Sequence, residues 1–106
     1  MKKSLSLGMP MKEAEGANKL QLGMLAMQKG NIREAENYIR QAIRKGLPDK
    51  ENEAAAYLQM CSLMMNKREF RAAKDFFRKA KALKPTTKQI VDQIKQLEKY
   101  ITRIPG

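Results

Sequence analysis

The chain has 106 residues, of which 42% are hydrophobic, and its 22 basic and 11 acidic residues give a formal net charge of +11. No apolar run approaches the ~20 residues of a membrane-spanning helix, and the absence of histidine excludes histidine acid–base catalysis and the commonest zinc sites. Since there is also no phosphate-binding glycine loop and no isolated carboxylate pair, we expect no catalytic residues, cofactor or metal.

The first eleven residues follow no helical pattern. Lys2 and Lys3 precede an apolar segment that is far too short for the core of a signal peptide. We therefore expect a flexible N-terminal arm over residues 1–11 and a helical domain over residues 12–106.

The rest of the chain repeats itself with an offset of 38 residues. When residues 17–42 are placed on residues 55–80, ten positions are identical and several others exchange one apolar residue for another. Such self-similarity indicates a repeat protein, in which each copy is one small group of helices. We expect Ala35 and Ala73, which occupy the same position in the two copies, to be buried where paired helices touch.

The first copy, over about 12–47, is predicted to form two helices. Leu22, Leu25 and Ala26 recur at a spacing of three to four residues, which is typical of the apolar face of an amphipathic helix. The pattern then breaks at residues 29–31, where the chain is expected to turn.

The second helix of this copy has recognisable signals at both ends. Asn31 and Glu34 have the spacing of a capping box at its start. Gly46 followed by Pro48 predicts its end. Its apolar face comprises Ile32, Ala35, Ile39, Ala42 and Ile43.

The second copy, over about 50–85, repeats this scheme. We expect one helix over 50–66 and another over 69–83, which ends before Pro85. Cys61 is expected to be a small packing residue in the first of these helices. As the only cysteine it forms no disulfide within the chain, which favours a reducing, cytoplasmic location.

A last helix is predicted over about 87–103. Thr86 and Gln89 have capping-box spacing at its start. One apolar stripe runs along it at steps of four and three residues: Ile90, Ile94, Leu97, Ile101 and Ile104. No partner helix follows, so this helix is expected to cover the exposed end of the last repeat.

Taken together, these residues resemble the tetratricopeptide repeat. In the first copy the resemblance is carried by Leu22, Gly23, Gly30, Ala35, Ile39 and Ala42. In the second copy it is carried by Tyr57, Met60, Cys61, Ala73, Phe77, Ala80 and Pro85. The first copy departs from the family at Lys19, which replaces an aromatic residue, and the period is four residues longer than the family's 34.

The resemblance implies an all-α solenoid of two helix–turn–helix repeats plus a C-terminal capping helix, used as a scaffold for protein–protein interaction. In this family the first helix of each repeat lines a concave groove, which here would be apolar and rich in methionine. The residues placed there are Leu20, Met24, Met27, Gln28, Leu58, Ser62, Met65 and Asn66. Such a groove suits an extended peptide or an amphipathic helix.

Two alternatives for the methionines stay open. They could be core residues, or the N-terminal arm, which carries Leu5, Leu7 and Met9, could fill the groove. A chaperone tail that ends in a carboxylate is a poor candidate partner, because Leu20 and Met24 occupy places where such family members carry lysine and asparagine.

A basic stripe offers a second candidate surface. Arg71, Lys74, Arg78 and Lys81 are spaced so that they share one face of a helix. The stripe would attract nucleic acid or an acidic protein, whereas the plainer interpretation is a solvated surface. No aromatic residue belongs to the stripe, and Phe70, Phe76 and Phe77 are expected to pack between helices.

Two further interpretations remain. The groove could hold an apolar segment of an exported protein, as a secretion chaperone does. The chain could also be a fragment of a larger protein, since two and a half repeats are close to the minimum for a stable solenoid.

Overall fold

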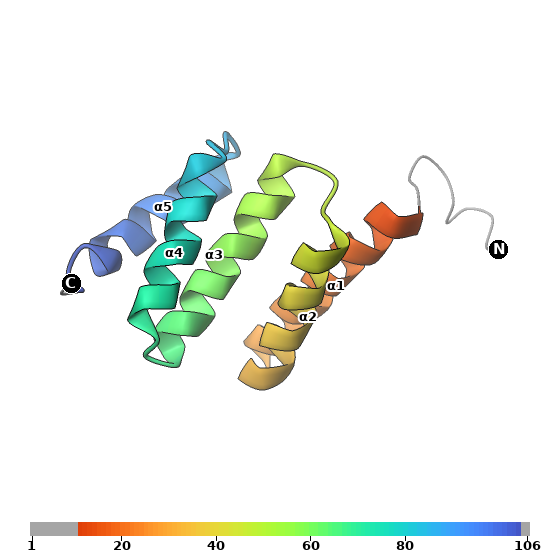
Figure 1. Ribbon diagram of the computed structural model, residues 1–106, viewed down its shortest axis with the longest axis horizontal. Helices are drawn as coiled ribbons and strands as arrows, with labels where there is room; N and C mark the ends of the chain where they lie inside the picture. The colour runs from red at the N-terminus through yellow and green to blue at the C-terminus, as the bar shows by residue number, and fades with distance from the viewer. Residues whose placement is uncertain (1–10, 105–106) are drawn as a thin grey trace. The chain divides into compact units, whose positions relative to one another are not determined.

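The computed structural model describes the backbone of residues 11–104 and the side chains of residues 18–104. Five α-helices and no strand are found in this part of the chain (Figure 1). The all-α prediction is confirmed. The arm predicted over residues 1–11 lies outside the described residues except for Met11, where the first helix begins.

The chain divides into two compact units, one up to Pro48 and one from Asp49 onward. Unit 1 contains α1 (Met11–Gln28) and α2 (Ile32–Lys45), and unit 2 contains α3 (Lys50–Asn66), α4 (Phe70–Ala82) and α5 (Lys88–Ile101). The helix ends lie within a few residues of the expected positions. That residues 12–106 form one domain stays a prediction.

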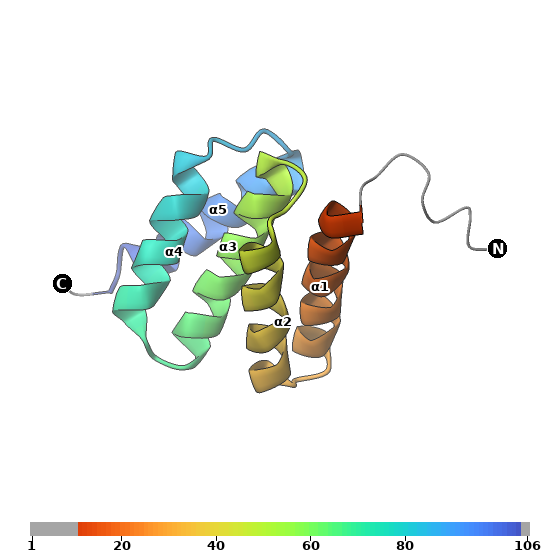
Figure 2. The same cartoon turned by 45° about the vertical axis from the view of Figure 1, so that its right-hand side comes forward.

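In unit 1, α1 and α2 pack as a hairpin of helices whose backbones approach closely (Figure 2). The reason is the presence of glycine on the contact face of α1. A Cβ atom on Gly23 would lie 2.5 Å from Cγ1 of Ile39 and 3.2 Å from the carbonyl oxygen of Ala35, and one on Gly16 would overlap the carbonyl oxygen of Gly46. Only glycine lets α2 lie this near.

This contact corrects the face predicted for α1. Of the three residues expected to be buried, only Ala26 is, whereas Leu22 is 42% and Leu25 50% exposed. The face that meets α2 is the one that contains Gly16 and Gly23. Seven residues, or about two helical turns, separate these glycines, so they lie on the same side of α1.

The turns that follow the helices repeat with the same offset of 38 residues. Gly30 and Arg68 both have a positive φ, of 85° and 65°, and so do Gly46 and Lys84, with 93° and 52°. In the α1–α2 turn the Gly30 N–H donates to the carbonyl oxygen of Met27, and in the α3–α4 turn the Arg68 N–H donates in the same way to that of Met65, both at 3.0 Å. The repeat therefore extends to the backbone of its loops, even where glycine is replaced.

The capping box predicted for α2 is not formed. Asn31 is the N-cap residue, but its side chain makes no capping hydrogen bond. In α3 a cap that was not predicted is present, because the Asn52 N–H donates to the Asp49 carboxylate at 2.8 Å.

The centre of unit 2 is α3, which has seven buried residues. From α4, Ala73, Phe77 and Ala80 are buried. Ala73 and its counterpart Ala35 in unit 1 are both fully buried, which confirms the expectation for these two positions. From α5 only Ile101 is buried, while Ile90, Ile94 and Leu97 of its apolar stripe are half-buried.

The start of α5 is held from α3 rather than by its own capping box. The Glu51 carboxylate accepts hydrogen bonds from the backbone N–H groups of Thr86 at 2.9 Å and Thr87 at 3.0 Å. It also accepts one from the Thr86 hydroxyl at 3.3 Å. The N-cap residue Thr87 makes no side-chain capping bond, so the predicted Thr86–Gln89 pair is wrong. Glu51 satisfies N–H groups that a capping side chain would otherwise bind.

This arrangement predicts a defined pH dependence. The hydrogen bonds, foremost that from the Thr86 N–H, lower the pKa of Glu51 from 4.5 to about 2. Since the pKa is lower in the folded state, the stability that Glu51 contributes is complete above about pH 4.5 and is lost as the pH falls towards 2. Glu51→Gln should therefore lower the free energy of unfolding at pH 7, and the difference from the parent should shrink on acidification.

Urea unfolding of both proteins at several pH values between 7 and 2 would measure this difference. The control is Glu53→Gln, which removes a carboxylate from the same helix turn and leaves the hydrogen bonds of Glu51 in place. A gap between Glu51→Gln and the parent that is equally wide at pH 7 and pH 2 would contradict the role given to this carboxylate.

Candidate protein-binding surfaces

In unit 1, the predicted groove residues divide into accessible and buried ones. Met24 is 38% exposed, Gln28 is exposed and Met27 is half-buried. Leu20 is only 4% exposed, so its assignment to an open groove is wrong. The reason is its position between Gly16 and Gly23, on the side of α1 that packs against α2.

In unit 2, the corresponding residues divide in the same way. Ser62 and Met65 are half-buried and Asn66 is exposed. Leu58 is fully buried. It is the equivalent of Leu20 in the second copy.

The two copies thus give the same result at equivalent positions. The pairs Met24/Ser62, Met27/Met65 and Gln28/Asn66 are all at least partly accessible, whereas the pair Leu20/Leu58 is buried. We call the six accessible residues the first-helix surface. None of them is charged, although the chain carries a net charge of +11. A continuous groove formed by both copies stays a prediction.

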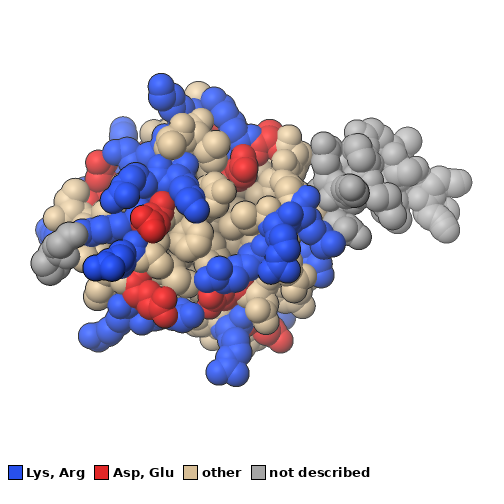
Figure 3. Space-filling view, viewed as in Figure 1, with Lys and Arg blue, Asp and Glu red and all other residues tan. Residues whose placement is uncertain are grey.

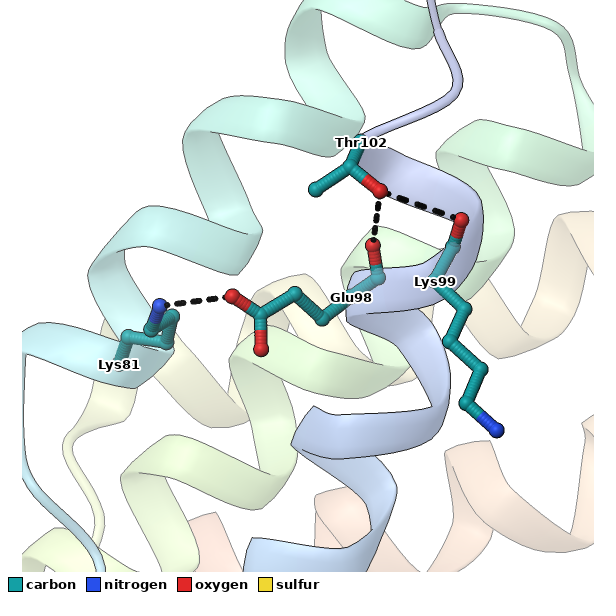
Figure 4. A network of polar contacts seen from close by, with 4 residues as sticks. All are labelled: Lys81, Glu98, Lys99 and Thr102. Atoms are coloured by element: carbon teal, nitrogen blue, oxygen red, sulfur yellow. Dashed lines mark hydrogen bonds and ion pairs between the residues drawn. The ribbon is translucent and has the colours of Figure 1, made fainter.

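Two of the four members of the basic stripe contact α5 or the residues just after it. The Lys81 ammonium group lies 3.2 Å from the Glu98 carboxylate, and the Lys74 ammonium group donates to the carbonyl oxygen of Ile104 at 3.1 Å. Beside the first of these contacts, the Thr102 hydroxyl donates to the carbonyl oxygen of Glu98 at 3.0 Å at the end of α5 (Figure 4). Lys74 and Lys81 are therefore positioning residues for the last helix.

Arg71 and Arg78 remain as the outward members of the stripe. Both are exposed, and Arg78 lies 3.6 Å from Asp75. On the face shown in Figure 3, lysine and arginine side chains cover much of the surface of unit 2 around α4, with acidic side chains among them. The mixed charge weakens the case for nucleic acid, which is attracted by an uninterrupted basic surface.

The three phenylalanines of α4 have different environments. Phe77 is buried, and Phe76 stacks on Tyr57 of α3 with ring centroids 6.1 Å apart, as expected for packing between helices. Phe70 is 39% exposed, so the packing role predicted for it is wrong. It lines a shallow hollow of about 480 Å³ on α4 together with Glu69, Arg71, Ala72 and Asp75.

Cys61 has the environment of a packing residue. It is fully buried in α3, and burial raises the pKa of its thiol to about 11. A thiol with so high a pKa is a poor nucleophile at neutral pH. Among residues 11–104 there is no group of three or more cysteine, aspartate or glutamate side chains that could bind a metal ion. No helix in the same range has the length and apolarity needed to span a membrane.

Comparison with known families gives a match that covers the C-terminal part of α1 and nearly all of α2. The tetratricopeptide repeat model matches residues 18–44. The chain contains a tetratricopeptide repeat. The matched residues coincide with the first copy, and the second copy follows the repeat at the offset of 38 residues in sequence and in its turns. No curated protein and no solved structure matches the chain.

Tetratricopeptide repeats are non-catalytic and generally mediate protein–protein interaction. In the repeats of this chain, sequence reasoning missed the role of Glu51, because no spacing rule connects a residue of α3 with the start of α5. It also missed that Leu22 and Leu25 are exposed. The equivalent residues of the second copy, Met60 and Leu63, gave no sign of this, because both are buried.

Proposed function

We propose that the chain binds a segment of another protein through the first-helix surface. The observation that carries this proposal is the equivalence of the two copies, because the same three positions of the first helix are accessible in α1 and in α3. A tetratricopeptide repeat binds partners with its first helices, which makes these positions the natural contact residues.

The side chains indicate what kind of segment would bind. Met24, Met27 and Met65 offer flexible apolar contacts that adapt to different side chains. Gln28 and Asn66 can donate and accept hydrogen bonds, which would suit the main chain of an extended peptide or the polar edge of an amphipathic helix. Because the surface has no charge, binding there should depend little on salt concentration.

The test compares two double variants. Met24→Glu with Met65→Glu places charge on the first-helix surface, and Arg71→Glu with Arg78→Glu reverses the outward members of the basic stripe. We expect the first variant to unfold within about 0.5 kcal/mol of the parent, because partly exposed side chains can keep a charge in water. The immobilised parent should capture its partner from a lysate of the source cells at ~0.05 M and at ~0.5 M salt, and mass spectrometry would identify it.

The expected result is that the methionine variant loses the partner while the arginine variant retains it. Capture that disappears at high salt and in the arginine variant, but persists in the methionine variant, would instead assign binding to the basic residues. A methionine variant that is destabilised by several kcal/mol would show that these side chains belong to the packing of the protein itself.

A further inference from the structure

The last helix of unit 2 is packed less tightly than the other two. There are seven buried residues in α3 and three in α4. In α5 only Ile101, its last residue, is buried, and the remainder of its apolar stripe is half-buried. A segment that buries little apolar surface opens at a lower free energy than the core on which it lies. We therefore expect α5 to open before α3 and α4 separate.

The connection between α4 and α5 depends on Glu51 of α3. The last N–H that donates into α4 belongs to Lys84. Pro85 has no N–H group, and the N–H groups of Thr86 and Thr87 both donate to the Glu51 carboxylate, at 2.9 and 3.0 Å. Without this carboxylate, the two N–H groups have no acceptor in the protein. One side chain of α3 therefore holds the chain at the point where α5 begins.

At the other end, α5 and the residues just after it contact two lysines of α4. The Lys81 ammonium group lies 3.2 Å from the Glu98 carboxylate, and both side chains are nearly half exposed (Figure 4). An ion pair so open to water contributes little to stability. The Lys74 ammonium group donates to the carbonyl oxygen of Ile104 at 3.1 Å, and water can replace it as a donor. The end of α5 is therefore held mainly by the burial of Ile101.

We infer that α5 detaches from α3 and α4 as a single segment while those two helices stay paired, and that Glu51 controls this opening. The helix has 14 residues, and isolated helices shorter than about 12–15 residues are marginal in water, so α5 should lose its helical structure when it detaches. The open state exposes the apolar surface of unit 2 on which Ile101 packs. This inference does not depend on the proposed function, which uses the first-helix surface of the closed state.

Native-state hydrogen exchange of the full chain tests the inference, measured by NMR at neutral pH and at urea concentrations below the unfolding transition. The amides of residues 94–98, in the middle of α5, should exchange at least about tenfold faster than those of residues 58–63 in α3. They should also share one urea dependence, because urea promotes an opening that exposes surface. Exchange in α5 that does not respond to urea would indicate fraying, and exchange as slow as in α3 would indicate no separate opening. Either result would overturn the inference.

A variant of the α3–α4 contact distinguishes separate opening from global unfolding. The Phe76 ring of α4 stacks on Tyr57 of α3 with centroids 6.1 Å apart. Since α3 and α4 stay paired when α5 detaches, Phe76→Ala should speed exchange at residues 58–63 at least about fivefold and at residues 94–98 less than about twofold. Equal acceleration in both helices would mean that α5 opens only when the whole of unit 2 unfolds, which would overturn the inference.

The role of Glu51 is tested with Glu51→Gln. The neutral amide accepts hydrogen bonds more weakly than the carboxylate, so exchange at residues 94–98 should become at least about fivefold faster. Glu53→Gln removes a carboxylate from the same helix turn and should leave the exchange of these residues within about twofold of the parent. If Glu51→Gln has no larger effect than Glu53→Gln, Glu51 does not control the opening.

Discussion

Ala73→Arg should destabilise unit 2 by several kcal/mol, enough to unfold much of the protein at room temperature. Ala73 is fully buried on the face of α4 that also buries Phe77 and Ala80. An arginine there has to displace well-packed neighbours, which costs about 1–3 kcal/mol, and the burial of its charge without a partner adds several more. Small domains have a total stability of only about 5–15 kcal/mol.

Ala82→Arg provides the matched control, because Ala82 lies on the same helix and is exposed. Its free energy of unfolding should stay within about 0.5 kcal/mol of the parent. Urea unfolding followed by circular dichroism measures both variants. If Ala73→Arg melts within one or two degrees of the parent, the helix pairing described for α4 is wrong.

The helices and their order could be predicted because the sequence contains two copies of one repeat, which can be compared position by position. A residue pattern that occurs once is weak evidence, but the offset of 38 residues shows which positions matter in both copies. The alanines at 35 and 73 illustrate this, since both are buried where their helices pack. Even the positive φ values of Arg68 and Lys84 follow from the glycines at the equivalent positions 30 and 46.

The face of α1 could not be predicted from hydrophobic periodicity. Leucine dominates such a pattern, so Leu22 and Leu25 were expected inside, whereas glycine contributes almost nothing to it. In the structure, α1 meets its neighbours at Gly16 and Gly23, where an added Cβ atom would overlap the atoms opposite. A helix packs on the face where its backbone can approach a neighbouring helix. A glycine can therefore determine the packing face as much as an apolar side chain does.

The contacts of α5 were equally hidden from the sequence. Lys74 and Lys81 share a helix face with Arg71 and Arg78, but only the tertiary structure shows that Lys81 contacts Glu98 of α5 and that Lys74 contacts Ile104 just after this helix. The start of the same helix is held by Glu51, more than thirty residues away. Local capping rules consider only the few residues around a helix end, and such distant partners lie beyond them.

Gly23→Ala tests the close approach in unit 1. In the interior of an ordinary helix, this substitution stabilises by about 0.5–1 kcal/mol, because alanine restricts the unfolded chain. Here we expect a loss of about 1–3 kcal/mol instead, since the added methyl group would overlap Cγ1 of Ile39. The exposed residue Gln21 on the same helix supplies the control, and Gln21→Ala should change the free energy of unfolding by less than about 0.5 kcal/mol.

The variant Ile39→Ala can show why Gly23→Ala loses stability. It removes Cγ1 and Cδ1 of Ile39, which the new methyl group would otherwise meet at 2.5 Å and 3.2 Å. The single change is costly because Ile39 is fully buried. In that background, however, Gly23→Ala should cost far less than in the parent, because only the Ala35 carbonyl oxygen at 3.2 Å remains close. The four proteins form a double-mutant cycle with an expected coupling of at least about 1 kcal/mol. An equal cost of Gly23→Ala in both backgrounds would mean that Ile39 does not require glycine at this position, and that the two helices are separated by more than the structure shows.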